Sequence, residues 1–215
     1  MNRKRLLLTL LLGATALPAL QGCFPVVATG VGSGVLAALD RRSLGTQTED
    51  ETIEWKASAR LRENFGEKVH VNFTSFNRKV LLTGEAPSAE MKAEVERLTA
   101  AIPNVQGVYN EIAIGGASSF SARSNDAFVT SKVKARFVDA NRFSANHVKV
   151  VTEAGAVFLL GLVTQREADA AIDVARTTAG VRKVVNVMEI ISEAKARELD
   201  PPPPDKSRQV EPGGG

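Results

Sequence analysis

The sequence predicts an α/β protein of the α+β type, made of two tandem copies of an α-β-β-α-β unit. Each unit is expected to form a small mixed sheet with two helices covering one face. The prediction rests on an internal repeat at a spacing of about 76–77 residues, and on a hydrophobic period that changes from helical to strand-like within each copy. Three matching pairs define the repeat: VLLTG at 80–84 with VFLLG at 157–161, HV at 70–71 with HV at 147–148, and VQGVYN at 105–110 with VRKVVN at 181–186.

An amphipathic helix opens each copy. Apolar residues recur every four positions, which places them on one helical face. Asp126 stands just before the stripe of the second copy, and we expect its side chain to cap the N-terminus of that helix. The stripes are Ile53, Ala57 and Leu61 in the first copy, and Val129, Val133 and Phe137 in the second.

A β-hairpin follows the helix in each copy. Val69, Val71 and Phe73 alternate with polar residues and precede a β-rich run at 80–82. In the second copy, residues 148–152 and 156–160 are expected to pair across a turn at 153–155. Gly84 and Gly161 occupy equivalent places, and we expect them to close the second strand of each hairpin.

A second helix and a last strand complete the unit. Thr164 and Glu167 have the spacing of a capping box, which predicts the start of this helix in the second copy. The last strands are expected at 108–114 and 184–191. A strand, a helix and a strand in succession predict a right-handed crossover and a parallel pair beside the hairpin. The apolar stripes of the second helix are Met91, Val95, Leu98 and Ile102, and then Ala168, Ile172, Ala175 and Ala179.

The N-terminus is typical of an export signal. Three basic residues precede an apolar stretch at 6–17, which is shorter than the about 20 apolar residues that span a bilayer. The following Leu20-Gln21-Gly22-Cys23 resembles the lipobox of bacterial lipoproteins. The resemblance implies that residues 1–22 are removed as a signal peptide and that Cys23 carries a diacylglyceryl group and an acyl chain. The alternative is a buried structural cysteine after an ordinary leader; as the only cysteine, it cannot form an internal disulfide.

Phe24 follows the lipobox cysteine. In the lipoproteins that this motif resembles, an aspartate at that place retains the protein at the inner membrane. Its absence therefore implies attachment to the periplasmic face of the outer membrane. Residues 23–45 would form the lipid anchor and tether, and the apolar, Gly-rich part at 24–39 either lies in the membrane interface or packs as a short helix.

The repeat resembles the BON domain. The resemblance is carried by the glycine after an apolar strand, by the V-x-x-V-x-N run before the last strand, and by RSLGTQ at 42–47. It extends from Cys23 to about Ile191 and implies a dual BON-domain outer-membrane lipoprotein, with domains at 46–114 and 124–193. A linker at 115–123 and a disordered, Pro-rich tail at 194–215 complete the expected organisation. The family resemblance implies binding to anionic phospholipid, support of envelope integrity, and neither catalysis nor a cofactor.

The charge balance argues against a general nucleic-acid-binding function. Residues 1–22 hold three basic residues and no acidic one, so their removal leaves 24 basic against 24 acidic side chains. The first domain, counted over 50–114, has 8 basic and 10 acidic residues, whereas the second, counted over 123–193, has 10 basic and 8 acidic ones. The second domain is therefore the better suited to an anionic surface.

The candidate lipid-contact region lies on the first helix of the second domain. With the apolar stripe turned to the core, Phe128, Lys132 and Arg136 fall on another stripe, and Lys134 lies nearby. Each cation near an anionic membrane contributes about 1 kcal/mol. The family resemblance implies contact at the start of this helix, so the predicted lipid-binding set is Phe128, Lys132, Lys134, Arg136 and Asp126. The alternative is that Phe128 packs against the first domain or the tether, and that the cations form a solvated helix face.

The remaining candidates favour a protein that is not an enzyme. His70 and His147 occupy equivalent repeat positions, but neither has a second ligand at a metal-like spacing, so we expect no metal site and two half-exposed side chains. No nucleophile–base pair, phosphate loop or dinucleotide fingerprint is present, which argues against a cofactor or a small-molecule substrate. Trp55 lies off the core stripe and is a candidate for docking against the second domain. The alternative to lipid binding is an adaptor whose domains dock onto outer-membrane assembly or cell-wall proteins.

Overall fold

The computed structural model describes residues 40–200. The predicted signal peptide, Cys23, most of the tether and the tail from residue 201 lie outside these described residues. The first repeat contains α3 (Leu44–Phe65), β1 (His70–Phe76), β2 (Lys79–Ala86), α4 (Ala89–Ala100), β3 (Gly107–Asn110) and β4 (Ala113–Ile114). The second contains α5 (Phe120–Ala140), the 3₁₀ turn η2 (Ala145–His147), β5 (Val148–Glu153), β6 (Ala156–Val163), α6 (Gln165–Arg176), β7 (Lys183–Asn186) and β8 (Glu189–Ile190). A last helix, α7 (Glu193–Leu199), follows.

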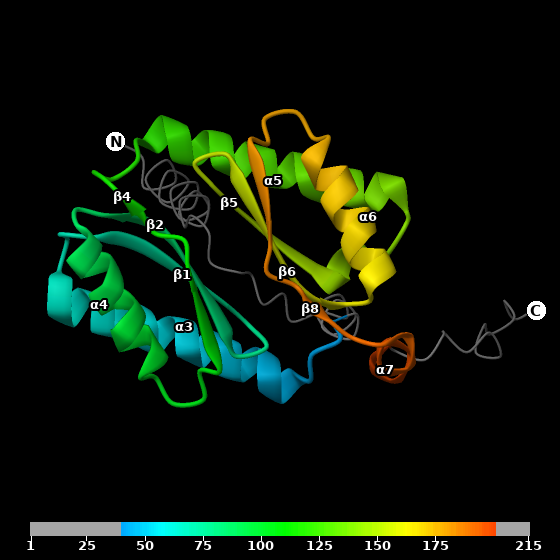
Figure 1. The fold of residues 1–215 in the computed structure, drawn as a ribbon, viewed down its shortest axis with the longest axis horizontal. Helices are drawn as coiled ribbons and strands as arrows, with labels where there is room; N and C mark the ends of the chain where they lie inside the picture. Colours follow the sequence, from blue (N-terminus) through cyan, green and yellow to red (C-terminus); the bar gives the residue numbers. More distant parts are fainter. Residues whose placement is uncertain (1–39, 201–215) are drawn as a thin grey trace, which may run out of the picture. The chain divides into compact units, whose positions relative to one another are not determined.

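Each repeat forms the mixed sheet that the sequence predicts. β1 pairs antiparallel with β2, and β2 pairs in parallel with β3 and β4. β5, β6, β7 and β8 repeat this arrangement. The chain reaches the parallel strand through a helix, α4 in the first repeat and α6 in the second (Figure 1). The α-β-β-α-β unit, its hairpin and its parallel pair are therefore confirmed.

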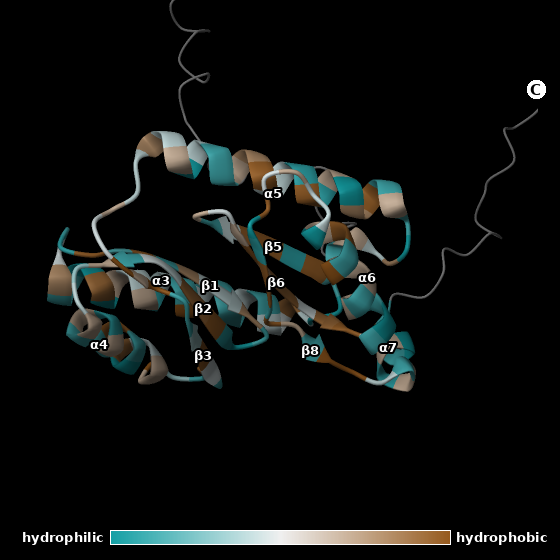
Figure 2. Ribbon diagram, turned by 45° about the horizontal axis from the view of Figure 1, so that its top comes forward, coloured by the Kyte–Doolittle hydropathy of each residue, from teal (hydrophilic) through white to brown (hydrophobic). Residues whose placement is uncertain are grey.

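The two faces of each central strand point into different cores. Val80 and Leu82 of β2 pack against residues of α3 and α4. Leu81 between them faces the other way, because side chains alternate along a strand. It joins Phe158 and Leu160 of β6 in an apolar cluster to which both repeats contribute. Figure 2 shows the hydrophobic residues along these central strands. The helices thus cover one face of each sheet, and the shared cluster covers the other.

A buried aspartate of each first helix holds the hairpin turn of its own repeat. The turn residues all have positive φ, as a two-residue turn of type I′ demands: Asn77, Arg78, Ala154 and Gly155. Asp50 accepts hydrogen bonds from two N–H groups of the first turn, at 2.8 and 2.7 Å. Asp126 accepts from two N–H groups of the second turn, at 2.8 and 2.9 Å. These bonds stabilise backbone conformations that are costly for non-glycine residues, and the turn expected at 153–155 is confirmed.

Gly84 and Gly161 lie inside the second strands, because β2 continues to Ala86 and β6 to Val163. The expectation that they close these strands is therefore wrong. A Cβ atom at Gly84 would lie 2.1 Å from the carbonyl oxygen of His70, and one at Gly161 would lie 2.3 Å from the carbonyl oxygen of His147. Glycine is needed there because the neighbouring strand approaches closer than a side chain allows.

The last strand of each repeat is broken once. β3 ends at Asn110 before β4 begins, and β7 ends at Asn186 before β8 begins. The side-chain oxygen of Asn110 accepts a hydrogen bond from the N–H of Ile112 at 3.2 Å, and that of Asn186 accepts one from Met188 at 2.9 Å. Such local bonds compete with the ladder of the sheet, so the continuous strands expected at 108–114 and 184–191 are wrong in this detail.

The first helix of the second repeat begins earlier than the sequence suggests. α5 starts at Phe120, and its N-cap is Ser119, whose side chain accepts a hydrogen bond from the N–H of Ala122. Asp126 therefore lies within the helix, and the expectation that it caps the helix is wrong. Residues 120–123 belong to this helix and not to a linker.

The end of the second repeat also differs from the expectation. Residues 194–199, expected as a charged helix end at the start of a disordered tail, belong to helix α7, and Ala196 of this helix is buried. The capping box of Thr164 and Glu167 is confirmed at the start of α6, where both of its hydrogen bonds are present. At the other end of the described chain, α3 starts at Leu44 behind its N-cap Ser43.

Candidate functional site

Phe128 projects from the solvent side of α5. Its residue is 61% exposed, whereas Val129 and Val133 on the same helix are buried in the core of the second repeat. This exposure argues against the alternative in which Phe128 packs against the first domain. A phenylalanine side chain that moves from water into an apolar environment contributes about 1.5–3 kcal/mol, so Phe128 is available for contact with something outside residues 40–200.

Two further large apolar side chains on α5 are exposed, Phe120 by 79% and Val138 by 66%. They lie about 27 Å apart along the helix axis, at 1.5 Å per residue. Single exposed apolar residues are ordinary, but several on one helix favour a helix that lies against an apolar boundary. Sequence reasoning missed both residues. A signal for Phe120 existed, because its repeat equivalent Leu44 opens the first helix and is exposed as well.

Two lysines accompany Phe128 on α5. The Nζ atom of Lys132 lies 4.7 Å from the centre of the Phe128 ring and donates a hydrogen bond to the carbonyl oxygen of Ala179 at 2.5 Å. Lys134 is exposed, and no hydrogen bond or ion pair ties it to the rest of residues 40–200. One lysine therefore stacks on the ring of Phe128, while Lys134, six residues further along α5, is exposed and can meet an anion.

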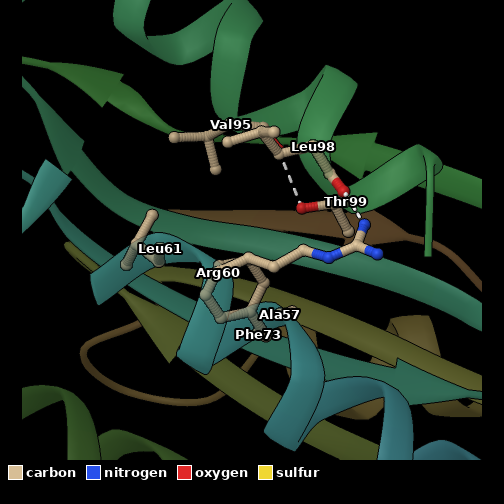
Figure 3. A pocket seen from close by; sticks show the side chains of 7 residues that line it. All are labelled: Ala57, Arg60, Leu61, Phe73, Val95, Leu98 and Thr99. Carbon is tan, nitrogen blue, oxygen red and sulfur yellow. Dashed lines mark hydrogen bonds between the residues drawn. The ribbon is translucent and has the colours of Figure 1, made fainter. Parts of the chain in front are cut away.

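The side chain of Arg136 makes hydrogen bonds within the second domain. It donates to the carbonyl oxygen of Val174 at 3.1 Å and to the hydroxyl of Thr178 at 2.9 Å, and so joins α5 to α6. In the first repeat Arg60 of α3 donates in the same way to the carbonyl oxygen of Leu98 in α4, at 3.1 Å (Figure 3). Because both repeats contain this bond, it belongs to the architecture of the unit and does not distinguish the second domain.

Asp126 lies away from the exposed surface. It is 6% exposed, and its two carboxylate oxygens accept the N–H groups of the hairpin turn described above. Asp126, predicted as part of the lipid-binding set, is therefore not part of the exposed contact surface.

The first domain differs from the second at two positions of this surface. The repeat places Thr52 where the second domain has Phe128, and Ser58 where it has Lys134. Trp55 of α3 is 68% exposed, so the expected docking of Trp55 against the second domain is not observed. Lys56 of α3 is the repeat equivalent of Lys132, so the domains differ at the positions of Phe128 and Lys134.

Further cationic side chains line an open hollow at the C-terminal end of α5. It has a volume of about 480 Å³ and is lined by residues that include Arg136, Arg142, Arg176 and Asp173. Arg142 and Arg176 lie 3.8 and 3.2 Å from the carboxylate of Asp173, and these three side chains are each more than half exposed. Exposed ion pairs contribute between 0 and about 1 kcal/mol, so these arginines can exchange their partner for another anion at little cost.

The two histidines have different surroundings. His70 is half-buried, as expected, and its Nδ1 atom lies 3.1 Å from Glu85 while its Nε2 atom lies 3.0 Å from Arg123. His147 is 8% exposed, so the expectation of a half-exposed side chain is wrong for this residue. Within residues 40–200, no group of three or more His, Cys, Asp or Glu side chains is arranged to hold a metal ion.

The hollow between α3, α4 and β1 is part of the core of the first domain. Figure 3 shows Leu61, Phe73 and Val95 directed into it, with Arg60 along its side. It has no volume accessible to water, and so it does not accommodate a ligand. Among the helices of residues 40–200, none combines the length and the apolar character that crossing a membrane requires.

Known proteins resemble this chain over both repeats. The family model of the BON domain matches residues 49–116 and 125–192. The outer membrane lipoprotein DolP of Haemophilus influenzae is 39% identical over 186 residues, which cover 86% of this chain and 95% of that protein. The 21 kDa hemolysin of Actinobacillus pleuropneumoniae is 36% identical over 71% of this chain and 80% of its own length. The osmotically-inducible protein Y of Escherichia coli is 26% identical over 66% of this chain and 73% of its own length.

Proposed function

The chain belongs to the BON-domain family, and we propose that it is a non-enzymatic outer-membrane lipoprotein whose second BON domain binds anionic phospholipid. In this proposal Cys23 carries the lipid anchor, the body faces the periplasm, and the protein supports the integrity of the envelope. The similarity to a relative named outer membrane lipoprotein and the lipobox-like residues 20–23 support the location.

The observation that carries the lipid-binding proposal is the exposed ring of Phe128 with Lys132 stacked on it, on a helix that also exposes Lys134. An aromatic side chain enters the boundary between headgroups and acyl chains, where its apolar surface leaves water. Lysines of the same helix would remain at the level of the phosphates, and each contributes about 1 kcal/mol near an anionic surface. Phe120 and Val138 extend the apolar contact toward both ends of the helix.

The difference between the repeats explains why we assign the contact to the second domain. Both domains have the same fold, but Thr52 and Ser58 stand in the first where Phe128 and Lys134 stand in the second. The first domain also has the more acidic charge balance, and an acidic surface is repelled by anionic lipid.

Vesicle binding of the chain without its anchor tests the proposal. The protein would be residues 23–215 with Cys23→Ser, mixed with vesicles that do or do not contain phosphatidylglycerol. We expect binding to the anionic vesicles alone, and weaker binding at high salt, because salt screens exposed charges beyond a distance of about 10 Å at 0.1 M. Phe128→Glu should weaken this binding by about tenfold or more, because it removes the apolar insertion and adds a like charge.

Trp55→Glu is the matched control, because Trp55 is about as exposed as Phe128 and lies on the equivalent helix of the first domain. It should leave vesicle binding unchanged. Equal binding by the Phe128→Glu variant and its parent would refute the proposed site. If the parent failed to bind vesicles at any salt concentration, the lipid proposal would be wrong, and an adaptor for outer-membrane assembly or cell-wall proteins would become the better interpretation.

A further inference from the structure

Arg41 and Arg42, at the start of the described chain, form ion pairs with different domains. The side chain of Arg42 is 12% exposed, donates to Asp50 at 2.7 Å and lies 3.9 Å from the centre of the Phe76 ring. These partners belong to the first domain. The side chain of Arg41 is only 3% exposed and lies in a socket of the second domain, although Arg41 precedes the first domain in the chain.

Each N–H group of the Arg41 guanidinium has an acceptor. Two hydrogen bonds go to the carboxylate of Glu167, at 2.7 and 3.0 Å. Two more go to the carboxylate of Asp200, at 2.7 and 3.2 Å. The fifth goes to the carbonyl oxygen of Leu162, at 2.9 Å. A guanidinium has five N–H groups, so its capacity to donate is fully used.

Three separate segments of the second half of the chain supply these acceptors. Leu162 lies near the end of β6, Glu167 lies in the first turn of α6, and Asp200 is the C-cap of α7. Glu167 also accepts the N–H of Thr164 at 2.8 Å within the capping box. Burial alone would raise the pKa of Glu167, but the hydrogen bonds from Arg41 and Thr164 lower it to about 2. The carboxylate is therefore ionised at neutral pH.

Arg41 cannot leave this socket without leaving buried charge behind. Burial alone would lower its pKa, but the hydrogen bonds to Asp200 and Glu167 raise that pKa above its ordinary value. Removal of one member of a buried, hydrogen-bonded ion pair is strongly unfavourable, because the other member remains uncompensated. His147 fills the side of the socket, with its ring nitrogens 3.7 Å from Glu167 and 3.6 Å from Asp200.

The socket has no counterpart in the first domain. The repeat places Met91 at the position of Glu167, and it places Ala117, before α5, at the position of Arg41. The contact is therefore not a requirement of the BON fold. The Arg41 contact is present in addition to the two BON folds, and it joins Arg41 at the start of the described chain to Asp200 at its end.

Helix α7 closes over this junction. Its Ala196 is buried, and Leu199 packs against the apolar cluster that the two domains share. The N–H of Asp200 donates to the carbonyl oxygen of Ala196 at 2.9 Å, which fixes Asp200 at the end of the helix. The bonds to Arg41 thus hold the helix at its C-terminal end.

We propose that Arg41 is a latch that fastens the segment following the anchor to the second domain and holds α7 closed over the shared cluster. The 16 residues between Cys23 and Asp40 span at most about 60 Å. A lipid on Cys23 would therefore keep the second domain within this reach of the membrane and raise the local concentration of α5 there. Only this last step rests on the proposed function.

Hydrogen exchange of α7 in the Cys23→Ser chain of residues 23–215 tests the latch. Arg41→Met removes the guanidinium, and Asp200→Asn removes the negative charge and one of the two acceptor oxygens. Both should make the amides of residues 196–200 exchange at least about tenfold faster, because the ion pair and its charge-assisted hydrogen bonds are weakened or lost. Asp200→Asn is the milder change, since the side chain of Asp200 is 37% exposed, and it keeps the test decisive should Arg41→Met fail to fold. Unchanged α7 exchange in Asp200→Asn would overturn the latch.

Glu198→Gln is the matched control, because it neutralises an acidic residue of the same helix whose carboxylate, within residues 40–200, pairs with Lys195 on the surface. Its α7 exchange should equal that of the parent; a rise as large as in Asp200→Asn would also contradict the latch, because loss of any acid in α7 would then suffice. Vesicle binding by the parent separates the two proposals. If the parent did not bind vesicles, the proposed lipid-binding function would be refuted, but the hydrogen-exchange result on α7 would still test the latch.

Discussion

Gly84 of β2 lies against the backbone of His70 in β1, and its own backbone has a φ of +107°. We predict that Gly84→Ala destabilises the protein by about 2–5 kcal/mol, because the new Cβ atom would meet the carbonyl oxygen of His70 in a backbone conformation that alanine rarely adopts. Gly161→Ala should also destabilise, since its Cβ atom would meet the carbonyl oxygen of His147. Urea unfolding followed by circular dichroism measures both changes.

Gly115→Ala provides the control for this prediction. No atom lies within 4 Å of a Cβ atom built at Gly115, so this variant should unfold within about 0.5 kcal/mol of the parent. A stability of Gly84→Ala equal to that of Gly115→Ala would show that the strands can separate without cost.

His147 is predicted to make the stability depend on pH. Burial lowers its pKa below the ordinary value of 6.5, and the charge of Arg41 acts in the same direction. Below pH 6.5 the unfolded chain therefore binds a proton that the folded chain resists, so the free energy of unfolding falls as the pH drops through this window. The pKa of Glu167 is lowered from 4.5 to about 2, so the free energy of unfolding falls a second time as the pH drops from 4.5 to about 2.

Urea titrations between about pH 7.5 and pH 5 check the contribution of the histidine. The parent should lose stability over this range, and His147→Gln should lose less, because its side chain does not titrate. The two pH profiles would be parallel if His147 were as easily protonated in the folded as in the unfolded chain.

At the scale of elements, α5 has cations with two different roles. Arg136 makes hydrogen bonds within the domain, whereas Lys134 faces solvent. Arg136→Ala should destabilise the protein by about 1–3 kcal/mol, because it removes the two hydrogen bonds that the guanidinium donates to the carbonyl oxygen of Val174 and the hydroxyl of Thr178. Lys134→Ala should leave the free energy of unfolding within about 0.5 kcal/mol of the parent, because the side chain is exposed. The same change should weaken binding to anionic vesicles several-fold, because one cation is lost. Urea unfolding and vesicle binding of the same two variants measure both effects.

Equal loss of vesicle binding in the two variants, at equal stability, would contradict this division. Arg60→Ala is a further control, because Arg60 makes the equivalent bond in the first domain. It should destabilise the protein as Arg136→Ala does without weakening the contact of α5 with the vesicles.

The division between Arg136 and Lys134 shows how far the sequence alone could go. Helical periodicity predicts the buried stripe correctly, because burial depends on spacing along one element: Ile53, Ala57, Leu61, Val129, Val133 and Phe137 are all buried. The same periodicity places Phe128, Lys132 and Arg136 on one exposed stripe. It cannot show that Arg136 reaches a carbonyl oxygen on α6, because that acceptor lies 38 residues away.

Contacts between distant parts of the chain also explain the other errors. Asp126 is a good helix cap by residue type, but its carboxylate binds a turn 28 residues further on. Residues 194–199 are charged and precede four prolines, so composition suggests the start of a tail. The helix they form is held by Arg41, 159 residues before Asp200, and no local pattern of the sequence encodes that pairing.

At the scale of the molecule, the shared cluster makes each domain depend on the other. Leu81 of the first domain and Phe158 and Leu160 of the second are all buried in it. If separated, each sheet would expose this apolar face to water, which costs roughly 25 cal/mol for each Å² uncovered. We therefore expect the two domains of the parent to unfold together in one transition.

Leu81 and Leu82 form a matched pair for this expectation, because both are fully buried neighbours on β2 and face opposite sides of the sheet. Replacement of either by alanine should cost about 2–5 kcal/mol. Leu82→Ala weakens the first domain from within and should keep a single transition at lower urea concentration. Leu81→Ala loosens the contact between the domains, so hydrogen exchange in urea should show β2 and β6 opening at different concentrations. A common opening of β2 and β6 in both variants would mean that this cluster does not couple the domains, and that junctions such as the Arg41 latch would have to do so.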